Sequence, residues 1–186
     1  MPRLFVSVDL PPDLEPKVRD LQSYLRGTRA DLRFTKPEQA HLTMKFIGDT
    51  PESSLKEVKE SIDEASEAVG PFRVELGGTG VFPSRDYVSV VWAGVREGVE
   101  ELTLLHESLE ESLVGRGLAD EAEHDYVPHV TLARMNSGRG RTEVLGFVDE
   151  HDDVTLGSFE ASGLRLKSSV LRDDGSVHTT EYEAEL

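Results

Sequence analysis

The sequence contains no cysteine and no long hydrophobic run. Without cysteine the chain cannot form a disulfide, use a thiol nucleophile or bind a metal through thiolates. No apolar stretch approaches the roughly 20 residues that a membrane-spanning helix needs. No apolar run follows a basic start either, as it would in a secretory signal. We therefore expect a cytoplasmic protein.

Basic residues are also scarce, with 20 Lys and Arg against 36 Asp and Glu and a net charge of −16. Such a chain is a poor candidate for wrapping long nucleic acid, because that binding is driven by neutralising phosphates. The acidic residues are spread along the chain, which is typical of a halophilic protein with a hydrated acidic surface; an acidic mesophilic protein is the alternative. The length predicts a single domain, bilobal and spanning residues 1–186.

Two matching motifs, His41–Met44 and His129–Leu132, are the strongest signal that the chain does contain. Each reads His, apolar, Thr, apolar, and each lies in a segment with the pattern of a β-strand. Because alternate side chains of a strand share a face, the His and Thr point one way and the apolar residues anchor them in a core. Two such strands side by side would form a floor for a phosphate, with one imidazole as acid and one as base.

A third His-x-Thr sequence begins at His178, but it lacks the apolar flanking residues. We interpret His178 as a strand residue without chemistry. Gly77–Gly80 is not a phosphate-binding loop, because the lysine and the following helix are missing, and a bend or bulge between strands is expected instead.

Hydrophobic periodicity predicts an α+β chain in two halves, each with one motif strand. Helices are expected at residues 14–25, 53–69, 99–114 and, more weakly, 142–148. Strands are expected at residues 4–10, 31–35, 40–47, 72–76, 87–95, around the second motif, at 154–171 and at 176–184.

Several blocks of the sequence, in order and at suitable spacing, resemble one known family. They are the two motifs within His41–Gly48 and Tyr126–Arg134, the opening strand Arg3–Pro11, the segments Gly80–Pro83 and Val91–Val95, and the closing hairpin residues Leu166–Leu171. These blocks resemble the 2H phosphoesterase superfamily and, within it, the RNA 2′,3′-cyclic phosphodiesterases, historically called 2′-5′ RNA ligases.

The resemblance implies an α+β, bilobal fold with two antiparallel-sheet lobes, helices outside and a central cleft. It implies hydrolysis of 2′,3′-cyclic phosphates at the ends of RNA or oligonucleotides to 2′-phosphates. No metal, cofactor, membrane or obligate protein partner is implied. By the same resemblance His41 is the proton donor and His129 the base, Thr43 and Thr131 bind the phosphate oxygens, and Arg134 is the phosphate-binding cation. The symmetry of the motifs leaves the two histidine roles interchangeable on sequence alone.

The strand geometry raises a question about the two neighbouring cations. Arg134 follows His129 by five residues, so in a regular strand it would face away and it reaches the site only if the strand ends, bulges or twists near Ala133. Lys45 is in phase with His41 and could be a second cation, although a solvated charge beyond the cleft is the alternative.

Other readings of the same residues stay open. The motif residues could be structural; they could form a non-catalytic RNA-end or nucleotide-binding module; or the site could join RNA ends in an ATP-independent reaction. A zinc hydrolase using both motif histidines with His124 or Asp125 is a further alternative, although no compact metal-binding spacing exists. Phe5, Phe82 and Tyr126 are candidates for stacking on a base, or are part of the core.

Overall fold

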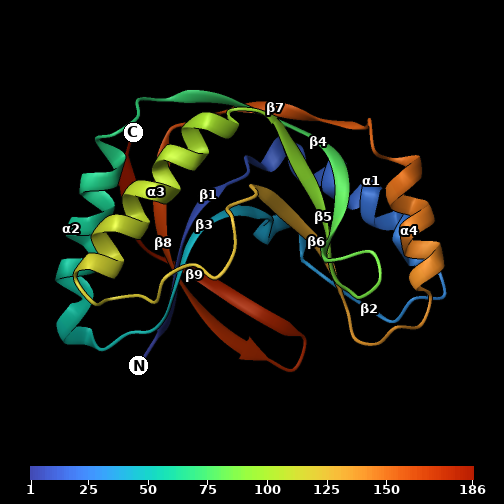
Figure 1. Cartoon of the computed structure of the whole chain (residues 1–186), viewed down its shortest axis with the longest axis horizontal. Coiled ribbons are helices and arrows are strands. Elements are labelled where there is room, and N and C mark those ends of the chain that lie inside the picture. The colour runs from blue at the N-terminus through green and yellow to red at the C-terminus, as the bar shows by residue number, and fades with distance from the viewer.

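The computed structural model describes all residues from Met1 to Leu186 and shows one curled antiparallel sheet with helices at its two ends (Figure 1). The strand order is β7-β4-β5-β6-β3-β1-β8-β9, and β2 pairs with β6. The strands are β1 (Arg3–Asp9), β2 (Leu32–Phe34), β3 (His41–Asp49), β4 (Phe72–Pro83), β5 (Val88–Glu97), β6 (His129–Met135), β7 (Thr155–Ala161), β8 (Gly163–Arg172) and β9 (Gly175–Glu185). The helices are α1 (Glu15–Arg26), α2 (Leu55–Ser66), α3 (Val99–Gly115) and α4 (Arg141–Glu150).

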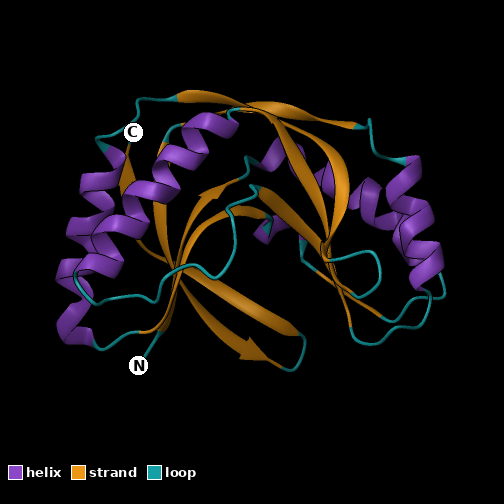
Figure 2. Ribbon diagram, in the orientation of Figure 1, coloured by secondary structure: helices purple, strands orange, loops and turns teal.

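The helices cover the sheet in two separate pairs, which define two lobes. Helices α2 and α3 pack on each other and against β3, β8 and β9, whereas α1 and α4 pack against β4, β6 and β7 (Figure 2). Each helix buries an apolar stripe; in α3 the buried residues are Leu102, Leu105, Leu109 and Leu113. None of the four helices has the length and apolar character needed to span a bilayer. The predicted α+β fold with helices outside two sheet lobes is therefore confirmed, and the lobes share one sheet.

The stretch 154–171 was predicted as one strand, and this is wrong. It forms two strands, β7 and β8, that are separated at Ser162; β7 is the edge strand at one end of the strand order, and β8 is next to the last strand at the other. Strand β7 pairs with β4 in one lobe, and β8 pairs with β1 in the other. The chain thus crosses between the lobes here, and β8 continues into a hairpin with β9 that projects between them (Figure 1).

The sheet opens where the two motif strands meet. Strands β3 and β6 pair only at Leu42 and Val130. Further along β6, the short strand β2 takes the place of β3 beside residues 133–135. Because few hydrogen bonds join β3 to β6, the sheet splays at this line and leaves a cleft along the polar faces of both motifs.

Both motif strands contain a bulge at the same place. In β3 the register with β1 passes from Thr43 to Lys45 while β1 advances by one residue, so Met44 is the extra residue. In β6 the register with β5 passes from Thr131 to Ala133 in the same way, so Leu132 is the extra residue. A bulge puts two residues opposite one and reverses the alternation of side chains beyond it.

Candidate active site

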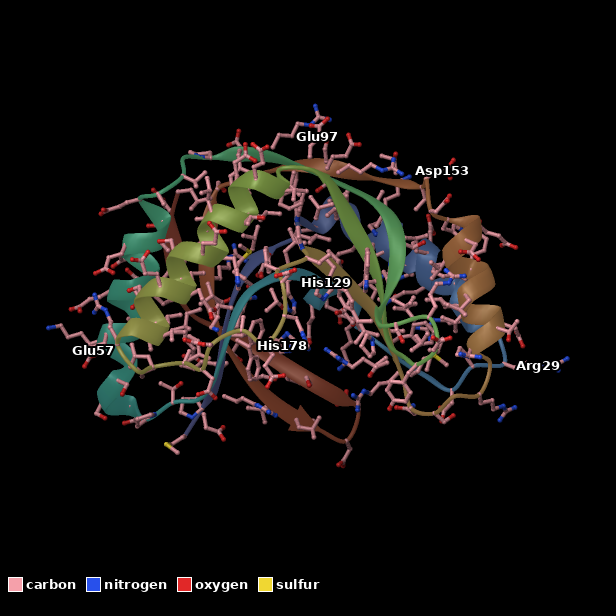
Figure 3. The ribbon with its side chains drawn as sticks, in the orientation of Figure 1. Arg29, Glu57, Glu97, His129, Asp153 and His178 are labelled. Atoms are coloured by element: carbon pink, nitrogen blue, oxygen red, sulfur yellow. The ribbon has the colours of Figure 1, made fainter.

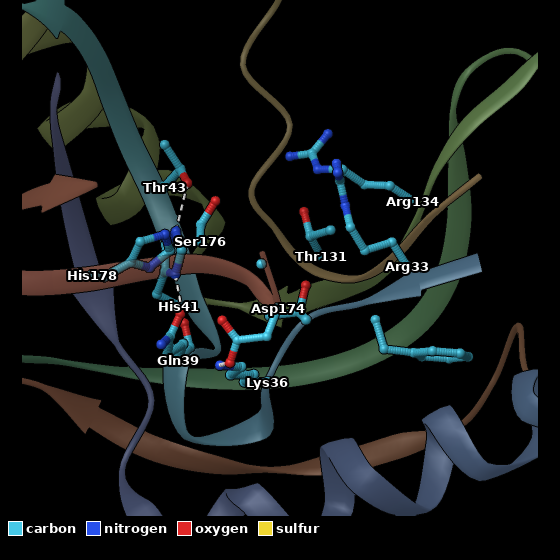
Figure 4. A pocket seen from close by; sticks show the side chains of 13 residues that line it. Arg33, Lys36, Gln39, His41, Thr43, Thr131, Arg134, Asp174, Ser176 and His178 are labelled. Carbon is cyan, nitrogen blue, oxygen red and sulfur yellow. Dashed lines mark hydrogen bonds and ion pairs between the residues drawn. The ribbon is translucent and has the colours of Figure 1, made fainter. Parts of the chain in front are cut away.

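The polar residues of both motifs lie in one cleft between the lobes. His41 and Thr43 from β3 face Thr131 from β6 across a cavity (Figure 4). His129 faces a second, adjoining cavity, and Thr43 lines both. Figure 3 shows His129 between the two lobes, on the inner side of the curled sheet, whereas charged residues such as Glu57 project from the outer surface of the molecule.

The two motif histidines are anchored in the same way. Nδ1 of His41 donates to the carbonyl oxygen of Gln39 at 2.8 Å, and Nδ1 of His129 donates to the carbonyl oxygen of Val127 at 2.7 Å. Since a carbonyl oxygen only accepts, each Nδ1 carries a hydrogen, and Nε2 is the nitrogen left for proton transfer.

The two Nε2 atoms differ in their partners. Nε2 of His41 lies 3.0 Å from Oγ1 of Thr43, which donates to it while the ring is neutral. Nε2 of His129 has no hydrogen-bond partner within the protein, and neither does the hydroxyl of Thr131. The second motif is therefore the one with free donors and acceptors for a ligand.

Burial lowers the pKa of both histidines. At His41 the carboxylate of Asp9 partly offsets this effect, while Lys167 and His129 add to it. At His129 the guanidinium of Arg134 adds to the lowering. Both rings are thus neutral in the free protein at neutral pH, and a bound anionic phosphate would favour the charged form of a ring beside it.

A third histidine, His178, packs beside His41. Its ring lies edge-on to His41 with centroids 5.4 Å apart, and edge-on to Phe5 at 4.9 Å, while Phe5 itself lies 5.0 Å from His41. Burial, with His41 and Lys167, lowers the pKa of His178 to about 4. The prediction that His178 is a strand residue is confirmed, and its strand brings the ring to the cleft beside His41. Its position depends on the β8–β9 pairing, which sets Ser169 opposite His178, and no local signal reveals that register.

His129 is supported by a different set of rings. Phe82 lies edge-on to it at 4.8 Å, and Trp92 lies behind at 6.1 Å. Gly77–Gly80 forms a bulge, as predicted, but the bulge lies within strand β4 and not between two strands, since the register with β5 shifts between residues 76 and 79 and the strand continues to Pro83. Gly80 is required there, because the Trp92 ring fills the space that a Cβ atom would take. The glycine segment thus makes room for the Trp92 ring that packs behind His129.

The bulge in β6 answers the question about Arg134. Because Leu132 is the extra residue, Leu132 and Ala133 are both buried and Arg134 returns to the face of Thr131. Arg134 accordingly lines the same cavity as Thr131 (Figure 4).

The matching bulge in β3 makes the prediction for Lys45 wrong. Met44 is the extra residue, so Lys45 leaves the face of His41 and is buried with 6% of its side chain exposed. Its Nζ lies 2.5 Å from a carboxylate oxygen of Glu110 and donates to the carbonyl oxygen of Asp120 at 2.6 Å. Lys45 is a paired internal charge and is neither a phosphate ligand nor a solvated one.

The cleft has two ends of opposite character. We call one end the basic arm, which is lined by Arg33, Lys36, Arg134, Asp174, Ser176 and His178. We call the other end the apolar arm, which is lined by Phe46, Ile47, Phe82, Pro83, Tyr126 and Val127. The loop at the rim of the apolar arm carries four acidic side chains, namely Asp120, Glu121, Glu123 and Asp125.

The three aromatic candidates occupy different places. Phe5 is buried beneath His41. Tyr126 stacks on His106 with centroids 4.3 Å apart, and its hydroxyl donates to the carbonyl oxygen of Thr43 at 3.1 Å. Phe82 is half-buried and lines the apolar arm. Phe82 and Tyr126 therefore both line the apolar arm, whereas Phe5 belongs to the core.

The residues considered for zinc do not gather around one point. No group of three His, Asp or Glu side chains is arranged to hold a metal ion. His124 and Asp125 lie on the loop at the rim of the apolar arm.

Comparisons with known proteins define first the class of protein. A crystal structure of a Thermus thermophilus protein superimposes with a TM-score of 0.82 at 28% identity, over 99% of this chain and 97% of that one. The crystal structure of E. coli LigT complexed with 3′-AMP superimposes with a TM-score of 0.79 at 19% identity, over 100% and 98% of the two chains, and shows the same fold. The curled sheet with two histidine strands is the 2H phosphoesterase fold.

The sequence comparisons then give the family. The model of the 2′-5′ RNA ligase superfamily matches residues 10–164. An RNA 2′,3′-cyclic phosphodiesterase of Methanothermobacter thermautotrophicus is 35% identical over 177 residues, which are 95% of each chain. One from Aeropyrum pernix is 36% identical over 163 residues, which are 88% of this chain and 91% of that protein. The chain belongs to the 2′-5′ RNA ligase superfamily.

Proposed function

We propose that this protein hydrolyses 2′,3′-cyclic phosphodiesters at RNA 3′ ends and leaves a 2′-phosphate. One observation carries the proposal: two histidines with Nδ1 bound to a backbone carbonyl and Nε2 left for the cleft. Opening a cyclic diester with water needs one proton removed and one supplied, and two such rings can do both. The relatives named as RNA 2′,3′-cyclic phosphodiesterases support this substrate class.

The proton transfers follow from the surroundings of each ring. Nε2 of His129 has no partner in the protein, and Arg134 favours its neutral form, so His129 takes the proton from water. The water oxygen bonds to phosphorus in line with the 3′ oxygen, and the bond from phosphorus to that oxygen breaks. Burial keeps His41 neutral in the free protein, but the bound anionic phosphate together with Asp9 favours its charged form, and His41 then gives the Nε2 proton to the departing 3′ oxygen. Solvent then restores both protonation states.

The remaining polar groups of the cleft bind the phosphate. Thr43 and Thr131 donate hydroxyl hydrogen bonds to the non-bridging oxygens, where negative charge builds in the transition state. Arg134 supplies a cation on the same face. The site takes its residues from both lobes, which supports the proposal that residues 1–186 form a single bilobal domain.

The test is hydrolysis of a short RNA ending in a 2′,3′-cyclic phosphate, in high salt with EDTA. We expect a 2′-phosphate product from the wild type and a loss of at least about 100-fold in rate for His41→Ala and for His129→Ala. His151→Ala is the matched control, because this histidine packs on Phe147 of α4, outside the cleft, and its loss should leave the rate unchanged.

Three outcomes would contradict the proposal. RNA binding without turnover would indicate a non-catalytic module. Turnover that appears only after a metal ion is added would indicate a different mechanism. Longer RNA in place of a 2′-phosphate would indicate end joining at the same site.

A further inference from the structure

Two arginines stand side by side on neighbouring strands of the basic arm. Arg33 of β2 pairs in register with Arg134 of β6, and both side chains line the same cavity (Figure 4). Like charges directly opposite each other on antiparallel strands destabilise the sheet. Burial, and then the guanidinium of Arg33, lower the pKa of Arg134. The pair is therefore an unfavourable arrangement until an anion lies between the two groups.

No carboxylate relieves this repulsion, although acidic residues outnumber basic ones in the chain. Neither Arg33 nor Arg134 forms an ion pair. The one acidic side chain of the basic arm, Asp174, is bound by Lys36, with Nζ and Oδ2 2.9 Å apart. Two guanidinium groups are thus left for a ligand, and Arg prefers planar anions such as carboxylate and phosphate.

Strand β2 is held in place by a buried amide. Nε2 of Gln22 in α1 donates to the carbonyl oxygens of Thr35 at 2.6 Å and of Leu132 at 3.0 Å. The backbone N–H of Thr35 also donates to the carbonyl oxygen of Leu132 at 3.1 Å. The bulged residue of β6 and the end of β2 are therefore tied together, which fixes Arg33 opposite Arg134.

The scissile phosphate already has enough partners without Arg33. The two histidines, the two threonines and Arg134 would surround it under the proposed function. Because Leu132 is a bulge, Thr131 and Arg134 stand opposite residues of β5 that are only two positions apart, or about 7 Å, so Arg134 stays near the scissile phosphate, while Arg33 lies one strand further out, on β2. The second guanidinium therefore suits a different phosphate group, at the outer end of the basic arm.

Resting on the proposed function, we propose that Arg33 binds the phosphodiester on the 5′ side of the terminal nucleotide, and that the natural substrate is an oligonucleotide end. The upstream strand then leaves through the basic arm. The apolar arm is excluded as its path because four acidic side chains line its rim. A nucleoside 2′,3′-cyclic phosphate lacks the upstream phosphate and cannot use Arg33.

The test compares three substrates that carry none, one or several upstream phosphates: a nucleoside 2′,3′-cyclic phosphate, a dinucleotide and a hexanucleotide with the same end. For the wild type we expect kcat/KM to rise about tenfold from the first to the second and little more to the third, since one charge-assisted contact is gained. In Arg33→Gln this rise should disappear. Arg33→Lys should keep part of the rise in kcat/KM, because lysine retains the positive charge but lacks the paired N–H donors of the planar guanidinium.

Salt dependence provides a second readout, through binding of the product dinucleotide with its 2′-phosphate. Loss of one phosphate contact should reduce the slope of log K against log salt by about 0.7 in Arg33→Gln. The matched control is Arg139→Gln, which removes the same charge from an exposed position outside the cleft and should change neither readout.

The outcomes separate the two proposals. If Arg33→Gln lowers kcat/KM equally for all three substrates, Arg33 acts on the scissile phosphate and the upstream subsite is overturned. If it lowers none, the subsite is also overturned. If the wild type hydrolyses no substrate, the proposed function fails; in that case equal binding of the product mononucleotide and dinucleotide overturns the subsite, and preference for the dinucleotide that Arg33→Gln removes supports it.

Discussion

The two motif strands are alike around their histidines and threonines and different beyond them. In both, histidine Nδ1 donates to the carbonyl two residues earlier, and the fourth motif residue is the bulge. The fifth residue after each histidine therefore returns to the cleft. That residue is Arg134 in β6 and Phe46 in β3, where 51% of Phe46 is exposed in the apolar arm.

This difference shows which property comes from the motif and which from its surroundings. The repeated motif supplies two histidines that are anchored in the same way, while the neighbouring residues give the two rings different charged neighbours and make one end of the cleft basic and the other apolar. Under the proposed function, the direction in which a substrate lies is therefore set outside the four residues that the motifs share.

The largest effect should come from removing both histidines together. We expect the double variant His41→Ala/His129→Ala to lose no more than a few-fold beyond either single variant, because the two rings serve one chemical step. Single-turnover rates measure this directly. Losses that multiply would mean that the rings act in separate steps and would break the equivalence of the two motifs.

The threonines test whether the two hydroxyls are equivalent. We expect Thr43→Val and Thr131→Val each to lower kcat by about 10- to 100-fold, since each removes one donor to a developing negative charge. Serine variants, which keep the hydroxyl, should recover most of the rate. A serine variant as slow as its valine counterpart would show that the hydroxyl alone is not sufficient, because serine keeps the hydroxyl and valine keeps the methyl group.

The pH profile of kcat/KM distinguishes the two rings, because a proton donor sets its alkaline limb and a proton acceptor sets its acidic limb. Under the proposed function His41 is the acid and His129 the base. As the acid, His41 sets the alkaline limb; Lys167 lowers its pKa, and Lys167→Met should move that limb to higher pH. His129 acts as a base and sets the acidic limb, which Arg134→Met should also move to higher pH, because loss of the cation raises the pKa of His129. Asp9, Lys167, His129 and His178 are the charged and titratable groups that face His41. A shift of the opposite limb in each variant would reverse the two roles.

The smallest effect is expected at His178, which has no counterpart of its kind beside His129. His178→Ala should lower kcat by about two- to tenfold, because an edge-on ring contact that orients His41 is lost. His178→Phe preserves that contact and should be close to wild type. If the phenylalanine variant is as slow as the alanine variant, a ring nitrogen of His178 contacts the substrate.

Local patterns in the sequence were enough to predict the motif strands and the helices, because alternation and helical periodicity depend on neighbouring residues alone. Such patterns could not predict which face of the strand the side chains of Lys45 and Arg134 occupy. Each depends on a bulge whose register is set by a partner strand, β1 or β5, that is distant along the chain. His178 was missed for the same kind of reason, since a hairpin pairing carries it to His41.

The bulge at Leu132 means that the number of residues between His129 and Arg134 determines whether the Arg134 side chain points into the cleft. Arg134 follows His129 by five positions, which in a regular strand would place the two side chains on opposite faces. The extra residue at the bulge lengthens the chain without changing the face, so both side chains point to the same side. Deleting Leu132 would remove only an aliphatic side chain and keep every chemically active group, yet it would aim the guanidinium at the core. In this strand the number of residues carries information that their identities do not.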